Sequence, residues 1–267
     1  MSQRSQPVAL TIAGSDCSAG AGAQADLKTF TALGVYGLTA LTCVVSETPG
    51  RVQRIQAVDV DVVADQIKLL LDSFPVAAIK TGMLYSAEIA SVVAQSLAGA
   101  NVPVVIDPVM VATSGDLLLK REAITVYERE LFPLAAVITP NLDEAATLLG
   151  RAIAGVDAMR SAGEELHARY GVPVLLKGGH LGGSDAIDML FRGVERLEFT
   201  APFVHDVDTH GTGCTYAAAI AAALASGETL DGAIAKAKEF VTSAIAQHFA
   251  WTHAGARIDA LNHSARR

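Results

Sequence analysis

A glycine-rich turn ahead of an alanine-rich helix carries the strongest chemical signal in this sequence. Its residues are His210, Gly211, Thr212, Gly213 and Cys214. Glycines at the start of a helix leave backbone N–H groups without intrahelical partners, and the helix dipole adds partial positive charge behind them. The turn therefore predicts an anion hole, suited to a phosphate that gains negative charge during its transfer.

Cys214 would fall in the first turn of that helix. Placement there can lower the pKa of a thiol from about 8.5 into the range of about 3.5–7.5. A thiolate with such a pKa could accept a proton from a substrate hydroxyl group at neutral pH. The plainer interpretation is a turn in which Cys214 is a small buried apolar side chain.

The first glycine-rich loop supports two interpretations. Gly20, Gly22 and Ala25 match a G-x-G-x-x-A fingerprint, so a Rossmann oxidoreductase that binds a dinucleotide is an alternative. That fingerprint places its first glycine directly at the end of a strand, whereas Gly20 lies six residues beyond Gly14. Small residues could instead let a substrate approach the backbone closely. Asp26 could then bond to a ligand donor, or it could simply place a favourable charge near a helix N-terminus.

Polar residues also follow the short apolar segments that we expect to form strands. In a parallel sheet flanked by helices, ligands bind in the crevice outside the carboxyl ends of the strands. Core packing alone does not explain several polar groups at one edge of a sheet, so these residues are candidates for ligand binding. They are 14–16, Glu47, 81–83, 107–108, Asn141, 177–179 and Asp208.

Apolar, β-branched runs alternate with segments of helical period through most of the chain. Strands that are buried on both faces and joined through helices form a mostly parallel sheet. The sequence therefore predicts a three-layer α/β/α fold in one domain over residues 1–267, with 254–267 as a loose C-terminal tail. The expected strands are 8–13, 38–46, 77–80, 104–107, 136–139 and 174–177, with a hairpin at 186–191 and 195–199. The expected helices are 24–33, 59–73, 87–98, 121–131, 143–149, 158–170, 214–225 and 230–251.

Composition narrows the class of protein. The 267 residues are 51% hydrophobic and 18% charged, which excludes a disordered chain. A net charge of −8 argues against nucleic-acid binding, which favours a basic surface. Three cysteines at irregular spacing fit neither a disulfide framework nor a zinc site, and the most apolar helix is shorter than the ~18 residues of a membrane span. We expect a cytoplasmic protein that binds neither nucleic acid nor membrane.

Several segments, taken in order, resemble the hydroxymethylpyrimidine/phosphomethylpyrimidine kinases, which are ribokinase-like enzymes of thiamine synthesis. No single segment is specific, but the set is, and it runs from about residue 8 to residue 249. The segments are AGSDCSAGAGAQAD, IKTGML, VVIDPVMVATSGDLLL, ITPNLDEAATLLG, VLLKGGHL and THGTGCTYAAAIAAAL.

The resemblance implies transfer of a phosphoryl group from Mg·ATP to the hydroxymethyl group of 4-amino-5-hydroxymethyl-2-methylpyrimidine. In the family, the monophosphate is then phosphorylated again to the diphosphate. The residues implied to line the pyrimidine pocket are Gly14, Ala21, Asp26, Val45, Met83 and Val109.

The same resemblance implies the groups that handle the nucleotide. Asp107 and Glu144 would hold Mg²⁺, which prefers oxygen ligands. Asn141, Lys177 and Thr212 would contact the phosphates of ATP, with Lys177 as a point charge. The resemblance also implies that residues 211–214 form the anion hole and that Cys214 stands in the position of the base. Plainer roles remain open: Asn141 could cap a helix with Glu144 in its first turn, and Lys177 could lie in solvent.

Glu47 departs from the family pattern. The second strand of the family continues as A-Q-N-T, whereas this chain has Ser46, Glu47, Thr48 and Pro49, so Glu47 takes the place of the glutamine. Glutamine both accepts and donates hydrogen bonds, but an ionised glutamate only accepts. Either the ring nitrogen of an aminopyrimidine or Glu47 itself must then carry a proton. We therefore expect substrate affinity to depend on pH. Cys17 likewise replaces the usual proline of the first loop.

This departure leaves two alternatives open. One is a kinase of pyridoxal or pyridoxine, which are also hydroxymethyl heteroaromatics, and the other is a non-catalytic ligand sensor on a kinase fold. Water must be excluded from the site, so 178–183 or 111–119 could form a lid. We also expect a homodimer, for which Leu69, Leu70 and Phe74 offer an apolar helix face.

Overall fold

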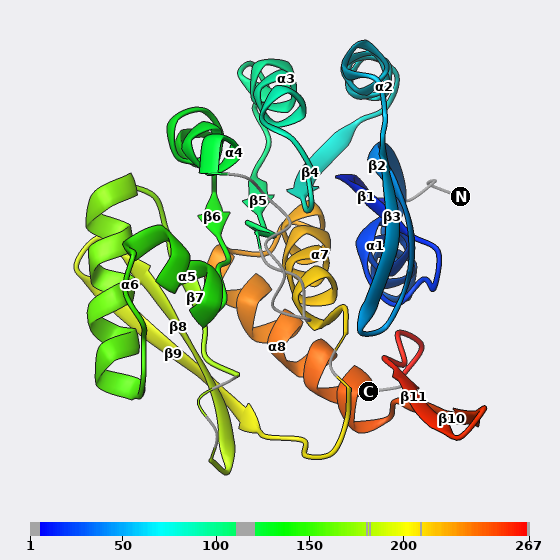
Figure 1. Cartoon of the computed structure of the whole chain (residues 1–267). Coiled ribbons are helices and arrows are strands. Elements are labelled where there is room, and N and C mark those ends of the chain that lie inside the picture. Colours follow the sequence, from blue (N-terminus) through cyan, green and yellow to red (C-terminus); the bar gives the residue numbers. More distant parts are fainter. Residues whose placement is uncertain (1–5, 111–120, 180, 182, 209, 266–267) are drawn as a thin grey trace, which may run out of the picture.

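The structure is a computed structural model that describes residues 6–110, 121–179, 181, 183–208 and 210–265. A nine-stranded sheet runs through the molecule in the order β3-β2-β1-β4-β5-β6-β7-β8-β9, and β10 and β11 form a separate pair (Figure 1). The strands are β1 (Val8–Asp16), β2 (Tyr36–Thr48), β3 (Arg51–Ala57), β4 (Val76–Thr81), β5 (Val104–Ile106), β6 (Val137–Ile138), β7 (Val174–Lys177), β8 (Asp185–Arg192), β9 (Glu195–Pro202), β10 (Phe249–His253) and β11 (Ala256–Ala260).

The six strands from β2 to β7 in this order pair in parallel, while β3, β8 and β9 are antiparallel at the two edges. This confirms the predicted mostly parallel sheet and the hairpin at its edge. The sequence reasoning missed β3. Most of its residues are exposed, so it has no apolar face that a periodic pattern could reveal.

Helices cover both faces of the sheet (Figure 1). One buried cluster joins the sheet to α2–α6, and a second joins it to α1, α7 and α8. The helices are α1 (Gly22–Ala32), α2 (Val60–Ser73), α3 (Ala87–Leu97), α4 (Arg121–Val126), α5 (Leu142–Leu149), α6 (Val156–Tyr170), α7 (Thr212–Ala225) and α8 (Leu230–Ala246), with a π-helical turn η1 (Tyr127–Leu131) and a 3₁₀ turn η2 (Phe132–Leu134). The predicted three-layer α/β/α class is confirmed.

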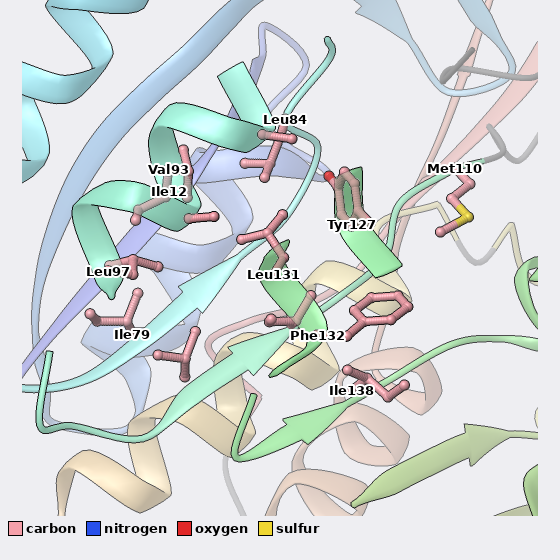
Figure 2. Close-up of a cluster of buried hydrophobic side chains, with 14 of the residues drawn as sticks. Ile12, Ile79, Leu84, Val93, Leu97, Met110, Tyr127, Leu131, Phe132 and Ile138 are labelled. Atoms are coloured by element: carbon pink, nitrogen blue, oxygen red, sulfur yellow. The ribbon is translucent and has the colours of Figure 1, made fainter. Parts of the chain in front are cut away.

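The first cluster is a tightly interdigitated core. Figure 2 shows Val93 and Leu97 of α3 pointing toward Ile12 and Ile79 of the sheet, with Leu131 of η1 beside them. All five side chains are at most 2% exposed. This core anchors the strands, so that their carboxyl ends keep fixed positions.

The alanine-rich helix α7 lies in the second cluster, packed against α8 and against β1, β4 and β5. Its residues 216–223 are all buried. Alanine has the highest helix propensity and a short side chain, so the helix can lie close to the sheet. Packing of this kind fixes the N-terminus of α7, where the glycine turn lies.

The C-terminal segment differs from the expected loose tail. Helix α8 ends at Ala246 rather than at Trp251, and β10 and β11 then pair as a hairpin around Gly255, whose φ is +81°. Leu261 and His263 are buried, and Nε2 of His263 lies 3.0 Å from Oγ1 of Thr215 in α7. Because the strands of this hairpin are mostly exposed, the sequence lacks the apolar pattern that would mark them. Within the described ranges, no helix is long and apolar enough to cross a membrane.

Candidate active site

A cavity of about 720 Å³ opens at the carboxyl ends of the parallel strands. Six of the strand-end candidates do not line it: Asp16, Thr81, Gly82, Pro108, Gly178 and Asp208. The residues assigned to the pyrimidine, the nucleotide, the metal or the anion hole all do, except Asp26. They are Gly14, Ala21, Val45, Glu47, Met83, Asp107, Val109, Asn141, Glu144, Lys177, Gly211, Thr212, Gly213 and Cys214. A larger and more open groove, of about 1410 Å³, lies between α1, α8 and the C-terminal hairpin. Because the paired lysine and carboxylates lie in the smaller cavity, we assign the chemistry to that one.

The glycine turn forms the start of α7. Gly211 has a φ of +81°, and a Cβ on it would collide with the carbonyl oxygen of Gly20. The first helical bond runs from the N–H of Thr215 to the oxygen of Gly211, so the N–H groups of residues 212–214 precede the helical ladder. Oγ1 of Thr212 is buried and has no hydrogen-bond partner within the described part of the chain. Unpaired donors and a buried hydroxyl at one helix start suit an anionic ligand.

Cys214 does not have the lowered pKa that the sequence predicts. Burial raises the pKa of its thiol to about 11, and although the charge of Lys80 and a backbone hydrogen bond from Gly22 oppose this rise, they do not cancel it. Loss of water around the thiolate thus outweighs the position at a helix start. At neutral pH the side chain is a thiol, and the thiolate needed for proton acceptance is a minor form.

Lys177 and Asp107 face the glycine turn from the sheet. Nζ of Lys177 donates to Oδ1 of Asp107 at 2.8 Å, and Oγ1 of Thr139 donates to the same oxygen at 2.9 Å. Nζ lies 3.4 Å, and Oδ2 of Asp107 3.7 Å, from the point that a Cβ on Gly213 would occupy. Burial disfavours the ammonium, but the nearby charges of Asp107 and Glu144 raise the pKa of Lys177. Lys177 therefore stays a cation beside the glycine turn, not a lysine in solvent.

Asn141 and Glu144 form a capping box at the start of α5. The N–H of Glu144 donates to Oδ1 of Asn141, and the N–H of Asn141 donates to Oε2 of Glu144, both at 2.8 Å. Burial raises the pKa of Glu144 to about 8, with Lys177 opposing the rise and Asp107 adding to it. Both residues line the cavity as well, so the capping role leaves them within the candidate site. The hard oxygen donors of Asp107 and Glu144 fit Mg²⁺.

The other end of the cavity is lined by small and apolar groups. A Cβ on Gly14 would lie 2.6 Å from Sγ of Cys43 and 3.1 Å from Cε of Met83, so a larger residue has no room there. Val45 and Met83 also line the cavity, and Glu47 adds a carboxyl group to its lining. A flat aromatic ring with one polar edge suits such a lining.

Burial and the negative charge of Asp16 raise the pKa of Glu47 to about 7, while the charge of His210 opposes the rise. Asp16, Glu47 and His210 each have a side-chain atom that could coordinate a metal ion, and these three atoms lie within 4.8 Å of one another. The sequence reasoning noted Asp16 at a strand end and His210 in the glycine turn, but it did not pair them. They stand 194 positions apart, so local pattern carries no sign of the contact.

The comparisons with known proteins agree with this geometry. Residues 16–259 match the family model described as phosphomethylpyrimidine kinase. The chain belongs to this family. It is 44% identical to the hydroxymethylpyrimidine/phosphomethylpyrimidine kinase of Rhizobium meliloti, over 89% of this chain and 90% of that protein. It is 46% identical to the thiamine biosynthesis bifunctional protein ThiED of Geobacter sulfurreducens, over 88% of this chain but about half (48%) of that protein's length.

Solved structures of similar proteins give the fold. The ADP complex of Bacillus subtilis pyridoxal kinase has a TM-score of 0.88 and 39% identity, and the match covers 98% of both chains. The phosphomethylpyrimidine kinase of Clostridium difficile has a TM-score of 0.78 and 38% identity, over 89% of this chain and 99% of that one. These matches confirm the ribokinase-like fold, and the family assignment overturns the Rossmann alternative.

Asp26 is the one residue of the expected pyrimidine pocket that does not line the cavity of this kinase family member. Its side chain is fully buried, and it does not line the cavity. Nζ of Lys80 donates to both carboxylate oxygens, at 3.0 and 2.8 Å, and the hydroxyl group of Thr11 donates to Oδ2. The carboxylate thus neutralises a buried lysine. Lys80 inside the apolar strand β4 was the available signal, because lysine is almost never fully buried unless it is paired.

The sequence reasoning also missed the far wall of the cavity in this family member. Residues 202–207, from the last residue of β9 onward, line this wall together with Val241, Thr242 and Ile245 of α8. Nζ of Lys238 donates to Oδ2 of Asp188 at 2.6 Å, and Oδ1 of Asp188 accepts from the N–H of Gly178 at 3.0 Å. This buried pair ties the loop after β7 to α8. The suggested lid at 111–119 lies outside the described residues.

Proposed function

We propose that this protein transfers a phosphoryl group from ATP to the hydroxymethyl group of 4-amino-5-hydroxymethyl-2-methylpyrimidine, and then phosphorylates the monophosphate, in thiamine synthesis or salvage. The observation that carries the proposal is the convergence at Gly213, where the ammonium of Lys177, a carboxylate oxygen of Asp107 and the start of α7 meet. The names of relatives that match nearly this whole chain point to the same reaction.

Residues at one end of the cavity would bind the phosphates of ATP and the Mg²⁺ ion. The N–H groups of residues 212–214 and the hydroxyl group of Thr212 bind phosphate oxygens, and Lys177 neutralises their charge. Asp107 and Glu144 would hold Mg²⁺, which supplies further positive charge to the phosphates when bound. Asn141 lines the same part of the cavity, where we propose that it contacts ATP.

The residues that would enclose the pyrimidine position its hydroxymethyl group, which accepts the phosphoryl group. Gly14, Ala21, Val45, Met83 and Val109 enclose the pyrimidine ring. Cys214 lines the same cavity, where its thiolate can take the proton of the hydroxymethyl group as the alcohol oxygen attacks the terminal phosphorus of ATP and ADP leaves. Phosphoryl transfer depends on positioning and charge neutralisation, so a small thiolate population can still contribute.

Pyridoxal kinase activity is the second candidate. The observation in its favour is the TM-score of 0.88 with the pyridoxal kinase of Bacillus subtilis, over 98% of each chain. Pyridoxal carries a hydroxymethyl group on an aromatic ring, so the same cavity could hold it. The family model and the curated relatives favour the pyrimidine.

ATP consumption by the purified protein separates the candidates. We expect turnover with hydroxymethylpyrimidine and with its monophosphate, and much lower kcat/KM with pyridoxal. Preference for pyridoxal would establish the second candidate. No turnover with any of the three compounds would contradict kinase function and leave the non-catalytic sensor.

We also propose a cytoplasmic homodimer of single-domain subunits. Leu69 on α2 is 68% exposed and Phe74, just after this helix, is 38% exposed; the ring of Phe74 stacks on Tyr36, which is 52% exposed. Apolar groups gathered in this way suit an interface. Light scattering on the wild type and on Leu69→Glu tests this surface: a dimer that the substitution does not weaken would place the interface elsewhere.

A further inference from the structure

Asp16, Glu47 and His210 form a cluster beside the cavity, which Glu47 and His210 line. Asp16 ends β1, Glu47 lies near the end of β2, and His210 precedes α7. One ligand atom from each lies within 4.8 Å of the other two. Such a cluster could bind either a metal ion or a proton. The hydrogen bonds of the three side chains show which of the two it suits.

Asp16 has no lone pair left for a metal ion. Its Oδ1 accepts from both the N–H and the hydroxyl group of Ser18 at 2.7 Å. Its Oδ2 accepts from the N–H groups of Gly20 and Ala21, at 3.1 and 2.7 Å, and from Nε2 of His210 at 3.1 Å. Burial disfavours the carboxylate, but these bonds outweigh burial and hold the pKa of Asp16 well below its usual range. Asp16 is therefore a permanent anion that holds the first loop and His210 in place.

His210 is fixed in orientation by its neighbours. A Cβ on Gly20 would lie 2.9 Å from Cδ2 of the ring, so the ring packs directly on this glycine. The backbone N–H of His210 donates to Oδ1 of Asp208 at 3.0 Å, while Nε2 is engaged with Asp16. Burial opposes a positive charge, but Asp16, Glu47 and Asp208 outweigh it and raise the pKa of His210. The ring is thus a donor held beside Glu47.

Glu47 has a fixed backbone and a titratable side chain. Its N–H donates to Sγ of Cys17 at 3.2 Å, and this thiol donates to the carbonyl oxygen of Glu47 at 3.1 Å. The groups that face its carboxyl group are Asp16, His210 and the buried thiol of Cys43. Asp16 favours the protonated carboxyl group and His210 favours the ionised one. Asp16 and His210 are both held in place, and they shift the pKa of Glu47 in opposite directions.

We propose that this cluster holds one exchangeable proton with which Glu47 binds the amidine edge of an aminopyrimidine, and that His210 is the positioning residue that sets the state of Glu47. The proposal rests on the proposed function. A protonated carboxyl group donates to the ring nitrogen and accepts from the exocyclic amine. If the proton moves to the ring, the carboxylate accepts both N–H groups in a charge-assisted pair. In either state, the Glu47 carboxyl group and the ring nitrogen share one proton. The ligand therefore binds only when this proton is present.

The proposal also defines the class of ligand. An aromatic ring with an amino group beside a ring nitrogen matches Glu47 and its proton. A pyridine with a phenolic oxygen has no amino group beside its ring nitrogen, so it can form only one of these two hydrogen bonds with the carboxyl group. The cluster is therefore a specificity determinant for aminopyrimidines.

Proton uptake on binding tests the proposal without turnover. Calorimetry with hydroxymethylpyrimidine and a non-hydrolysable ATP analogue at pH 8, in two buffers of different ionisation enthalpy, counts the protons taken up. With the pKa of Glu47 at about 7, we expect about 0.9 proton per site in the wild type. We expect none for Glu47→Gln, whose amide supplies the donor permanently.

His210→Gln shows whether His210 acts through Glu47. Loss of the cation raises the pKa of Glu47, so the pH at which uptake is half-maximal should move upward. The same substitution in the Glu47→Gln background should produce no such shift, and a merely structural role for His210 would not produce this difference. Equal proton uptake in the wild type and Glu47→Gln, or an unchanged midpoint in His210→Gln, would overturn the proposal. So would binding that requires added Zn²⁺ after treatment with a chelator. A protein that binds no hydroxymethylpyrimidine at all would instead contradict the proposed function.

Discussion

Lys177 and Asp107 stand 70 positions apart in the sequence, yet Nζ of the lysine bonds to Oδ1 of the aspartate at 2.8 Å. They lie on neighbouring parts of one sheet edge because parallel strands end on the same side. The contact leaves Oδ2 of Asp107 facing the glycine turn, 3.7 Å from the Cβ position of Gly213. The ammonium of Lys177 and the carboxylate of Asp107 thus both face the same glycine turn.

Lys177→Ala should lower kcat by about 10²–10³-fold, the usual cost of removing one group that stabilises a developing anion. Lys177→Arg should recover part of this loss, because arginine keeps the charge but not the compact ammonium. Steady-state kinetics with ATP and hydroxymethylpyrimidine measure both. Lys68→Ala, at an exposed pair on α2, is the matched control and should leave kcat unchanged. A loss below threefold in Lys177→Ala would remove Lys177 from the phosphate site.

Cys214→Ala should bind both substrates but lose at least about tenfold in kcat, the low side of the cost of removing a general base. With a thiol pKa of about 11, the thiolate is about one part in 10⁴ at pH 7 and grows tenfold per pH unit. The kcat of the wild type should therefore rise between pH 7 and pH 9, and that of Cys214→Ala should not. Cys214→Ser is the control for size. A wild-type kcat that stays flat over this range would contradict the assignment of the thiolate as proton acceptor.

Glu47→Gln should flatten the pH dependence of KM for the pyrimidine. Glu47 has a pKa of about 7, raised by burial and by Asp16, so it carries its proton below pH 7 and loses it above. In the wild type, KM should be constant below pH 7 and rise roughly tenfold per unit above it. KM for ATP in the same assays is the internal control and should lack this break. A break that persists in Glu47→Gln would place the titrating group elsewhere.

The sequence was informative where a signal is local. The glycine turn precedes an apolar helix of clear period, and Asp107 and Lys177 follow strands with apolar patterns, so their common edge could be predicted from α/β topology. The capping box of Asn141 and Glu144 is likewise a local pattern.

The features that could not be predicted from the sequence are contacts and burial that arise only in the folded protein, and strands without an apolar pattern. The bond between His210 and Asp16 joins residues that are 194 positions apart. The raised pKa of Cys214 comes from burial, which position at a helix start does not reveal. Strands β3, β10 and β11 are mostly exposed, so no apolar period marks them.

The buried pair of Asp26 and Lys80 should stabilise the fold without contacting substrate. Both side chains are fully buried, and removing one partner leaves the other charge unpaired, so Lys80→Met should lower the free energy of unfolding by about 3–5 kcal/mol. The double variant Asp26→Asn/Lys80→Met removes both charges and should recover much of this loss, because a buried neutral pair has no uncompensated charge. Urea denaturation of the wild type, both single variants and the double variant gives the coupling free energy. Additive losses would show that the two charges do not compensate each other. A large rise in KM for the pyrimidine in Asp26→Asn, with unfolding unchanged, would return Asp26 to the substrate pocket.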